Sequence, residues 1–172
     1  MLYTSKRRIV LIIAIDTREQ LPYPFDGMQT QRCTLKAGDY SVVGYEDRVA
    51  VERKSHSDAW QSMSSGRGRF ERCVKRLAAL DRAAIVIECS LSELCERPSQ
   101  IQRTNVASVV GGLVSYSAQY AIPVFFADNR LLAERIVFRY LASWIKHRGK
   151  GGAAQADALA QVGASVGAVD VQ

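Results

Sequence analysis

Asp39, Glu52 and Lys54 are the residues of this sequence whose types and spacing best suit chemistry on a phosphate. Two carboxylates on one face of a sheet repel each other unless a cation joins them. Mg²⁺ takes oxygen ligands in proteins, typically one or two carboxylates together with waters and substrate phosphates. A lysine beside such a pair can orient or help deprotonate a water, or stabilise charge that develops on a phosphate. These residues predict a magnesium site, provided that the fold brings them together.

A β-hairpin is the local structure that would bring them together. Two β-prone runs flank the turn-like segment 44–47, which begins with glycine, and this pattern predicts two antiparallel strands. With 44–47 as the loop, Asp39 opposes Glu52 at a Cβ separation of roughly 5 Å. The period of two along a strand then places Lys54 on the same face as Glu52 and turns Arg53 away.

Two further acids lie near the N-terminus. Asp16 ends the apolar run 9–15, a buried strand by composition, and strand ends in such sheets tend to present functional groups. Glu19 follows three residues later. A plainer interpretation also exists, in which Glu52 and Lys54 form a solvated ion pair at a strand end. The residue pattern leaves both interpretations open.

The remaining chain alternates strand-like and helix-like segments. Further strands are expected at 31–35, 83–89 and 123–127, and amphipathic or apolar helices at 69–80, 105–120 and 131–146. Alternation of this kind predicts an α/β layered domain, and the early hairpin makes its central sheet mixed. The domain is expected to span residues 1–148. Gly and Ala supply half of residues 149–172, which predicts a flexible tail.

The charge distribution favours a polyanionic partner. The formal net charge is +6, and the densest cationic segment is 66–82. A solvated helix face would explain such a run, but its position just after the candidate site favours contact with phosphates. The candidate phosphate-binding residues are Arg67, Arg69, Arg72 and Arg76.

The N-terminus resembles an export signal only superficially. A basic segment precedes the apolar run 9–15, but that run is short and meets Asp16 without a small-residue cleavage site. No stretch approaches the roughly 20 apolar residues that span a bilayer. We therefore expect an intracellular protein without a membrane partner.

Several segments resemble one known family. GDY at 38–40 followed by VERKSHSD at 51–58 resembles the GDX(n)ERKXXXD signature of the XPF-type structure-specific endonucleases. The resemblance extends, in family order, over roughly residues 1–148, through IDTRE at 15–19, GRGRFERCVKRL at 66–77, IVIE at 85–88 and VVGGLVSYSAQYAIPVFF at 109–126.

This resemblance implies a restriction-endonuclease-like, PD-(D/E)XK core and Mg²⁺ or Mn²⁺ dependence, with no small-molecule cofactor. It implies incision of branched DNA such as flaps and forks, in repair or recombination, and a homodimer formed through the last two helices and the strand between them. The compartment would be cytoplasmic in a prokaryote or phage and nuclear in a eukaryote. Carried over by position, the metal ligands are Asp16, Asp39 and Glu52, the catalytic lysine is Lys54, and the supporting residues are Glu19, Arg53 and Asp58.

Two alternatives remain at this point. The chain could be a non-catalytic DNA-binding subunit that pairs with an active partner, although intact GD, ERK and D elements argue against this. It could also be another PD-(D/E)XK nuclease, such as an exonuclease or a junction resolvase, which the ERKXXXD spacing disfavours. Larger relatives carry helix-hairpin-helix modules or a helicase, and neither is expected here.

Overall fold

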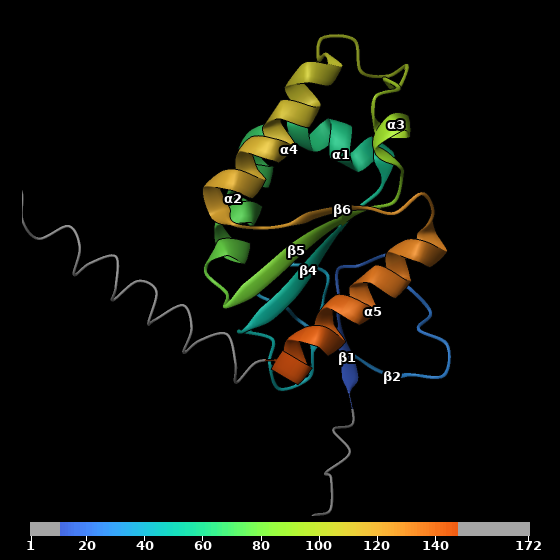
Figure 1. The fold of residues 1–172 in the computed structure, drawn as a ribbon, viewed down its shortest axis with the longest axis vertical. Coiled ribbons are helices and arrows are strands. Elements are labelled where there is room, and N and C mark those ends of the chain that lie inside the picture. The colour runs from blue at the N-terminus through green and yellow to red at the C-terminus, as the bar shows by residue number, and fades with distance from the viewer. Residues whose placement is uncertain (1–10, 148–172) are drawn as a thin grey trace, which may run out of the picture.

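Helices lie on both faces of a six-stranded mixed sheet whose strand order is β2-β1-β3-β4-β5-β6 (Figure 1). This computed structural model describes residues 11–147, so the predicted tail at 149–172 lies outside the described residues. The β1 strand pairs with β2 in parallel and with β3 in antiparallel fashion, while β4, β5 and β6 run parallel. The predicted mixed α/β sheet is confirmed.

The elements follow the predicted alternation. The strands are β1 (Ile12–Asp16), β2 (Gln29–Cys33), β3 (Tyr40–Val42), β4 (Val49–Lys54), β5 (Arg82–Ile87) and β6 (Val124–Phe126). The helices are α1 (His56–Met63), α2 (Arg67–Ala78), α3 (Leu91–Leu94), α4 (Val106–Tyr120) and α5 (Arg130–His147). Within the described residues, no helix is long and apolar enough to cross a membrane.

Two elements differ from the sequence-based expectation. The predicted strand 31–35 begins earlier, at Gln29, and ends at Cys33, and most of its residues are exposed. Leu35 is buried but lies beyond the end of the strand. It is apolar because it packs in the core, and not because the strand extends to it. The short helix α3 was not predicted. It begins with a capping box in which Ser90 and Glu93 exchange hydrogen bonds. A capping box involves only neighbouring residues, so it does not indicate which elements the helix packs against.

The sheet separates two apolar cores, and β4 contributes to both. Val49 and Val51 pack with the core beneath α5, whereas Ala50 packs with the core beneath α1, α2 and α4. Because side chains alternate along a strand, Glu52 and Lys54 continue the face of Ala50, and Arg53 continues the α5 face. The apolar half of β4 therefore sets the direction of the charged half.

The hairpin has the predicted register. Tyr40 pairs with Val51, which places Asp39 opposite Glu52. The backbone N–H of Asp39 donates to the carbonyl of Val51 at 2.9 Å. Gly38 precedes it at φ +74°, and a Cβ at that position would lie 2.9 Å from the Cβ of Ala50. Glycine thus permits the close approach that seats Asp39 against β4.

Candidate active site

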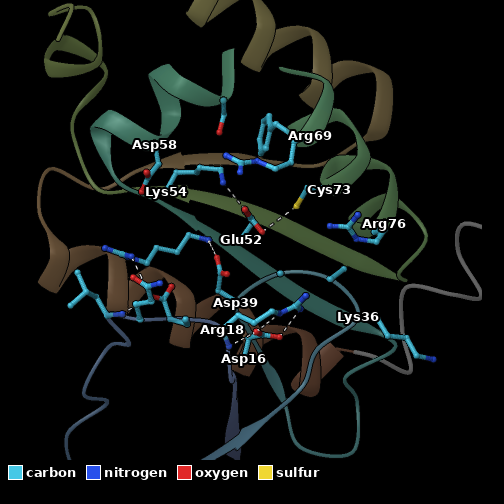
Figure 2. A pocket seen from close by; sticks show the side chains of 18 residues that line it. Asp16, Arg18, Lys36, Asp39, Glu52, Lys54, Asp58, Arg69, Cys73 and Arg76 are labelled. Carbon is cyan, nitrogen blue, oxygen red and sulfur yellow. Dashed lines mark hydrogen bonds and ion pairs between the residues drawn. The ribbon is translucent and has the colours of Figure 1, made fainter. Parts of the chain in front are cut away.

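A cleft of about 450 Å³ opens beside the sheet, lined by β1, the segment before β3, β4, α1 and α2 (Figure 2). The tertiary structure brings all seven predicted site acids and bases to this cleft, although they come from four separate stretches of chain. The lining includes Asp16, Glu19, Asp39, Glu52, Arg53, Lys54 and Asp58.

Asp39 and Glu52 form the acidic centre of the cleft. One carboxylate oxygen of Asp39, Oδ2, accepts a hydrogen bond from the backbone N–H of Arg53 at 2.7 Å. Burial, together with the neighbouring Glu52 charge, raises the pKa of Asp39 well above its ordinary value. The Glu52 charge thus opposes the ionisation of Asp39, as the hairpin register predicts for like charges that face one another.

Lys54 partly offsets this negative charge. Its Nζ lies 2.7 Å from Oε1 of Glu52 and 4.9 Å from the centre of the Phe70 ring. Burial by itself would lower the pKa of Lys54, but the attraction and hydrogen bond of Glu52 outweigh burial and raise that pKa above its ordinary value. Lys54 is therefore an ammonium at neutral pH, suited to donating hydrogen bonds and stabilising negative charge.

Cys73 completes the surroundings of Glu52. Its Sγ donates to Oε2 of Glu52 at 3.3 Å. Burial and the Glu52 charge raise the pKa of the Cys73 thiol to about 12, so the sulfur keeps its proton at neutral pH. The sequence showed Cys73 only as one member of an apolar helical stripe, and its contact with the acidic centre had no local signal.

Asp16 lies in the same cleft but has strong partners of its own. Its two oxygens accept from Nε and Nη2 of Arg18 at 2.7 and 2.9 Å. The backbone N–H groups of Arg18 and Leu35 donate to it at 2.7 Å each. Burial would raise the pKa of Asp16, but these bonds lower it overall, so the carboxylate is ionised. A cation that used Asp16 would have to compete with the Arg18 guanidinium.

The donor set suits a hard divalent cation. Asp39, just before β3, and Glu52 of β4 supply carboxylate oxygens, and their mutual repulsion would be relieved by a bound cation. Among residues 11–147, no three His, Cys, Asp or Glu side chains converge closely enough to hold a metal as they stand. Asp39 and Glu52 therefore fit the predicted Mg²⁺ or Mn²⁺, with water and phosphate completing the ligands. The metal role of Asp16 stays a prediction.

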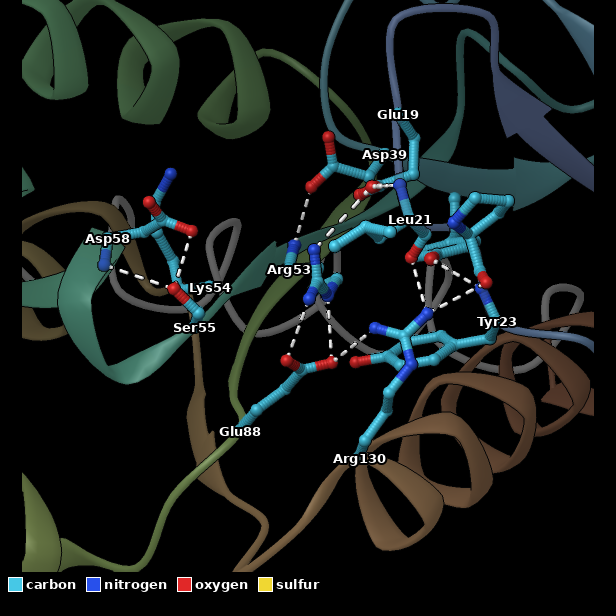
Figure 3. Close-up of polar contacts among 12 residues, drawn as sticks. Glu19, Leu21, Tyr23, Asp39, Arg53, Lys54, Ser55, Asp58, Glu88 and Arg130 are labelled. Carbon is cyan, nitrogen blue, oxygen red and sulfur yellow. Dashed lines mark hydrogen bonds and ion pairs between the residues drawn. The ribbon is translucent and has the colours of Figure 1, made fainter.

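The supporting residues divide between two positions. Arg53 turns toward the α5 face, where Glu88 binds its Nε and Nη2 at 2.8 Å each (Figure 3). Oε1 of Glu19 lies 3.5 Å from Nη1 of the same guanidinium. Asp58 belongs to the first turn of α1, where its carboxylate accepts from the Ser55 hydroxyl at 2.6 Å. Because Ser55 caps this helix, Asp58 helps to hold the start of α1 beside Lys54.

Helix α2 contributes positively charged side chains to the lining of the cleft. Arg69, Cys73 and Arg76 follow i, i+4 and i+7 spacing and line the cleft together. Arg67 and Arg72, also predicted to contact phosphates, do not line it, and their role stays a prediction. Arg18 and Lys36 contribute two further cations that the sequence did not single out.

Comparison with known proteins identifies a family and similar solved structures. The ERCC4 domain family matches residues 15–139. A structure of XPF from Aeropyrum pernix superposes with a TM-score of 0.53 at 26% identity, over 67% of this chain and 52% of that chain. A structure of XPF from Aeropyrum pernix in complex with DNA gives a TM-score of 0.58 at 23% identity, over 77% of this chain and 66% of that one. No curated protein matches the sequence.

The chain thus spans between half and two thirds of the length of these XPF structures. The family match covers the hairpin, the cleft and most of α5. The mixed sheet, its flanking helices and the superpositions all correspond to the predicted restriction-endonuclease-like core. The chain therefore belongs to the ERCC4 domain family, and its fold is that of an XPF-type nuclease domain.

Proposed function

We propose that this chain is a metal-dependent endonuclease that hydrolyses phosphodiester bonds of DNA near branch points. One observation carries the proposal: two opposed carboxylates, Asp39 and Glu52, share a cleft with the ammonium of Lys54. Cationic side chains edge the same cleft. This combination suits a reaction whose substrate and transition state both carry negative charge on phosphate oxygens. Family membership supports the reaction class.

Each residue of the cleft has a distinct task in this reaction. Asp39 and Glu52 would hold the cation, which supplies Lewis acidity toward the phosphate. Lys54 donates hydrogen bonds to the phosphate oxygens as their charge grows, because its raised pKa keeps it protonated. The ion pair with Glu52 holds the ammonium in place before the substrate arrives. Lys54 is thus an electrostatic stabiliser rather than a proton acceptor.

Branched DNA is the substrate class that the family and the cleft together favour. One of the similar structures, XPF from Aeropyrum pernix, was determined in complex with DNA. In this chain the arginines of α2 border the acidic centre, where they would bind the strand on either side of the scissile phosphate. Such contacts read the backbone and not the bases, so we propose recognition by DNA shape rather than sequence.

The defining experiment is cleavage of end-labelled flap, fork, four-way and plain duplex DNA by the full chain. Each substrate is incubated with Mg²⁺, Mn²⁺ or EDTA. We expect cuts close to the branch that require the divalent ion. Binding without cutting on every substrate would identify a DNA-binding subunit instead, and cutting from free ends would identify an exonuclease.

The α2 arginines should determine the salt dependence of DNA binding. Each phosphate contact contributes roughly 0.9 to the slope of log K against log salt. We expect Arg69→Gln and Arg76→Gln each to flatten this slope by about one unit, measured by fluorescence anisotropy in EDTA between about 50 and 200 mM salt. Arg103→Gln removes an exposed arginine outside the cleft and serves as the matched control. Equal slopes in all three variants would exclude α2 as the phosphate-binding element.

We further propose that the chain forms a homodimer through α4, β6 and α5. Among the described strands β6 is at the sheet edge, with α4 and α5 on its two sides (Figure 1). A largely apolar groove of about 360 Å³ runs between α4 and β6, and Val114 on its wall is 61% exposed. Exposed apolar surface of this kind is typical of interaction sites.

A charge placed in this groove should separate the dimer. Val114→Glu would bury a carboxylate among apolar side chains, so we expect the dimer dissociation constant to rise at least about tenfold in sedimentation velocity. Ser115→Glu introduces the same charge on an exposed part of the same helix, outside the groove, and should leave it unchanged. A wild-type chain that sediments as a monomer at assay concentrations would contradict the proposed dimer.

A further inference from the structure

Glu88 is the centre of a charged network beside α5 that includes Arg53 and Arg130 (Figure 3). It follows β5 directly, and its backbone N–H donates to the carbonyl of Lys54 at 2.8 Å. Its carboxylate binds Arg53 through two hydrogen bonds of 2.8 Å and Nη1 of Arg130 at 3.1 Å. The Glu88 and Arg53 side chains are only 10% and 11% exposed.

Arg130 connects this network to a distant part of the chain. It is the first residue of α5, and its Nη2 donates to the carbonyls of Leu21 and Pro22 in the segment after β1. Its guanidinium also lies 4.7 Å from the centre of the Tyr23 ring. Arg130 therefore joins Glu88, the start of α5 and the segment that carries Glu19.

The network bears on the active site through Arg53. That residue lies between Glu52 and Lys54 in β4, and its backbone N–H holds the Asp39 carboxylate at 2.7 Å. A buried guanidinium without its carboxylate partner is costly, so loss of Glu88 would displace Arg53 or admit water beside it. Either change would move the backbone that directs Glu52 and Lys54 into the cleft.

We propose that Glu88 is a positioning residue of the nuclease site. Through its hydrogen bonds to Arg53, it orients the side chains of Glu52, Lys54 and Asp39. Arg130, on α5, holds Glu88 in position. This role rests on the proposed nuclease function, because it assigns Glu88 to the same reaction. Glu88 does not touch the substrate in this scheme, so its loss should reduce turnover and spare DNA affinity.

Glu88→Gln and Arg130→Met test the proposal kinetically. We expect Glu88→Gln to lower kcat by about tenfold or more, as is typical when an outer partner of a site residue is lost. Arg130→Met should lower kcat less, and both should leave KM and the Kd for DNA within about twofold, since neither binds the substrate. Asp81→Asn is the matched control, because it removes an exposed Arg48–Asp81 ion pair at the opposite end of β4 and β5.

A double variant and hydrogen exchange separate positioning from general destabilisation. Because both residues act through one contact, the loss of kcat in the double variant should be smaller than the product of the single losses. Hydrogen–deuterium exchange should quicken in segment 52–54 of either variant and stay unchanged in segment 82–86. Asp81→Asn should change neither kcat nor exchange at 52–54.

Unchanged kcat in folded Glu88→Gln would overturn the proposal, and so would a fall in kcat accompanied by an equal loss of DNA affinity. If Glu88→Gln does not fold, Arg130→Met decides, because its side chain is 40% exposed and its loss is better tolerated. A wild-type chain that cuts no DNA would refute the proposed function itself. Hydrogen–deuterium exchange at 52–54 would then still test the effect of Glu88 on this segment. Unchanged exchange in both variants would exclude the positioning role of Glu88.

Discussion

Replacing Lys54 by Ala is expected to lower kcat on branched DNA by about 10²–10³-fold, the usual cost of losing one preorganised electrostatic donor. Lys54 is a protonated ammonium held against Glu52 at 2.7 Å, so in the proposed reaction it would stabilise charge from a position set before the substrate binds. DNA affinity and the thermal midpoint should change little by comparison. Single-turnover cleavage at saturating enzyme measures the chemical step directly.

The control for Lys54→Ala is another ion-paired lysine. Lys75 bonds Glu71 at 2.8 Å on the exposed side of α2 and does not line the cleft. Lys75→Ala should cut DNA at the wild-type rate. If Lys54→Ala also kept its turnover, Lys54 would be only a structural partner of Glu52, and the proposed chemistry would need a different electrostatic stabiliser.

Replacing Asp39 by Asn should abolish cleavage and at the same time stabilise the fold. The loss of a carboxylate that would hold the cation removes several kcal/mol of transition-state stabilisation, so we expect kcat to fall more than about 10²-fold. The amide oxygen can still accept the hydrogen bond from the Arg53 N–H. The variant no longer places a second negative charge opposite Glu52, so its free energy of unfolding at neutral pH should increase.

The pH dependence of this stabilisation has a definite sign. The native pKa of Asp39 is raised well above its ordinary value of 3.8 by burial and by Glu52, so the native state binds the proton more tightly than the unfolded chain. The stability that protonated Asp39 contributes is fully present below the unfolded-state pKa of this carboxyl. It is lost as pH rises through the native pKa. The thermal midpoints of wild type and Asp39→Asn should therefore converge near pH 4 and diverge toward about pH 8.

Two controls make the Asp39 result specific. Asp47→Asn changes the same residue type in the exposed loop of the same hairpin and should show neither effect. Mg²⁺ should raise the thermal midpoint of the wild type at about pH 8 and leave that of Asp39→Asn unchanged, because ligand binding stabilises only a protein that retains the site. An Asp39→Asn variant that is less stable than wild type at this pH would show that the carboxylate is not under repulsion.

Local pattern was sufficient to predict the centre of the site. The alternation of side chains along 48–54 and the four-residue loop 44–47 together set the register that opposes Asp39 and Glu52 and turns Arg53 away. These relations involve neighbours in sequence or across one tight turn, where the geometry leaves little choice.

The partners of those residues depended on the tertiary structure. Arg18 and the Leu35 N–H hold Asp16, and no pattern within 15–19 distinguishes that arrangement from a free metal ligand. Glu88 appeared in the sequence only inside the predicted strand 83–89 and in the segment IVIE of the family resemblance, and Arg130 had no signal at all. Such contacts join residues far apart in sequence, and only the packing of whole elements decides which distant charges meet.

The sequence by itself determined the fold class, the hairpin register and the residues that face one another at the acidic centre. Each of these follows from a short-range period of two or 3.6 residues. The tertiary structure decided which arginines of α2 reach the cleft, that Cys73 contacts Glu52, and that Arg53 is anchored by Glu88 from the opposite face. The physical reason is that periodicity orients a side chain relative to its own element, whereas its partner is set by how separate elements pack.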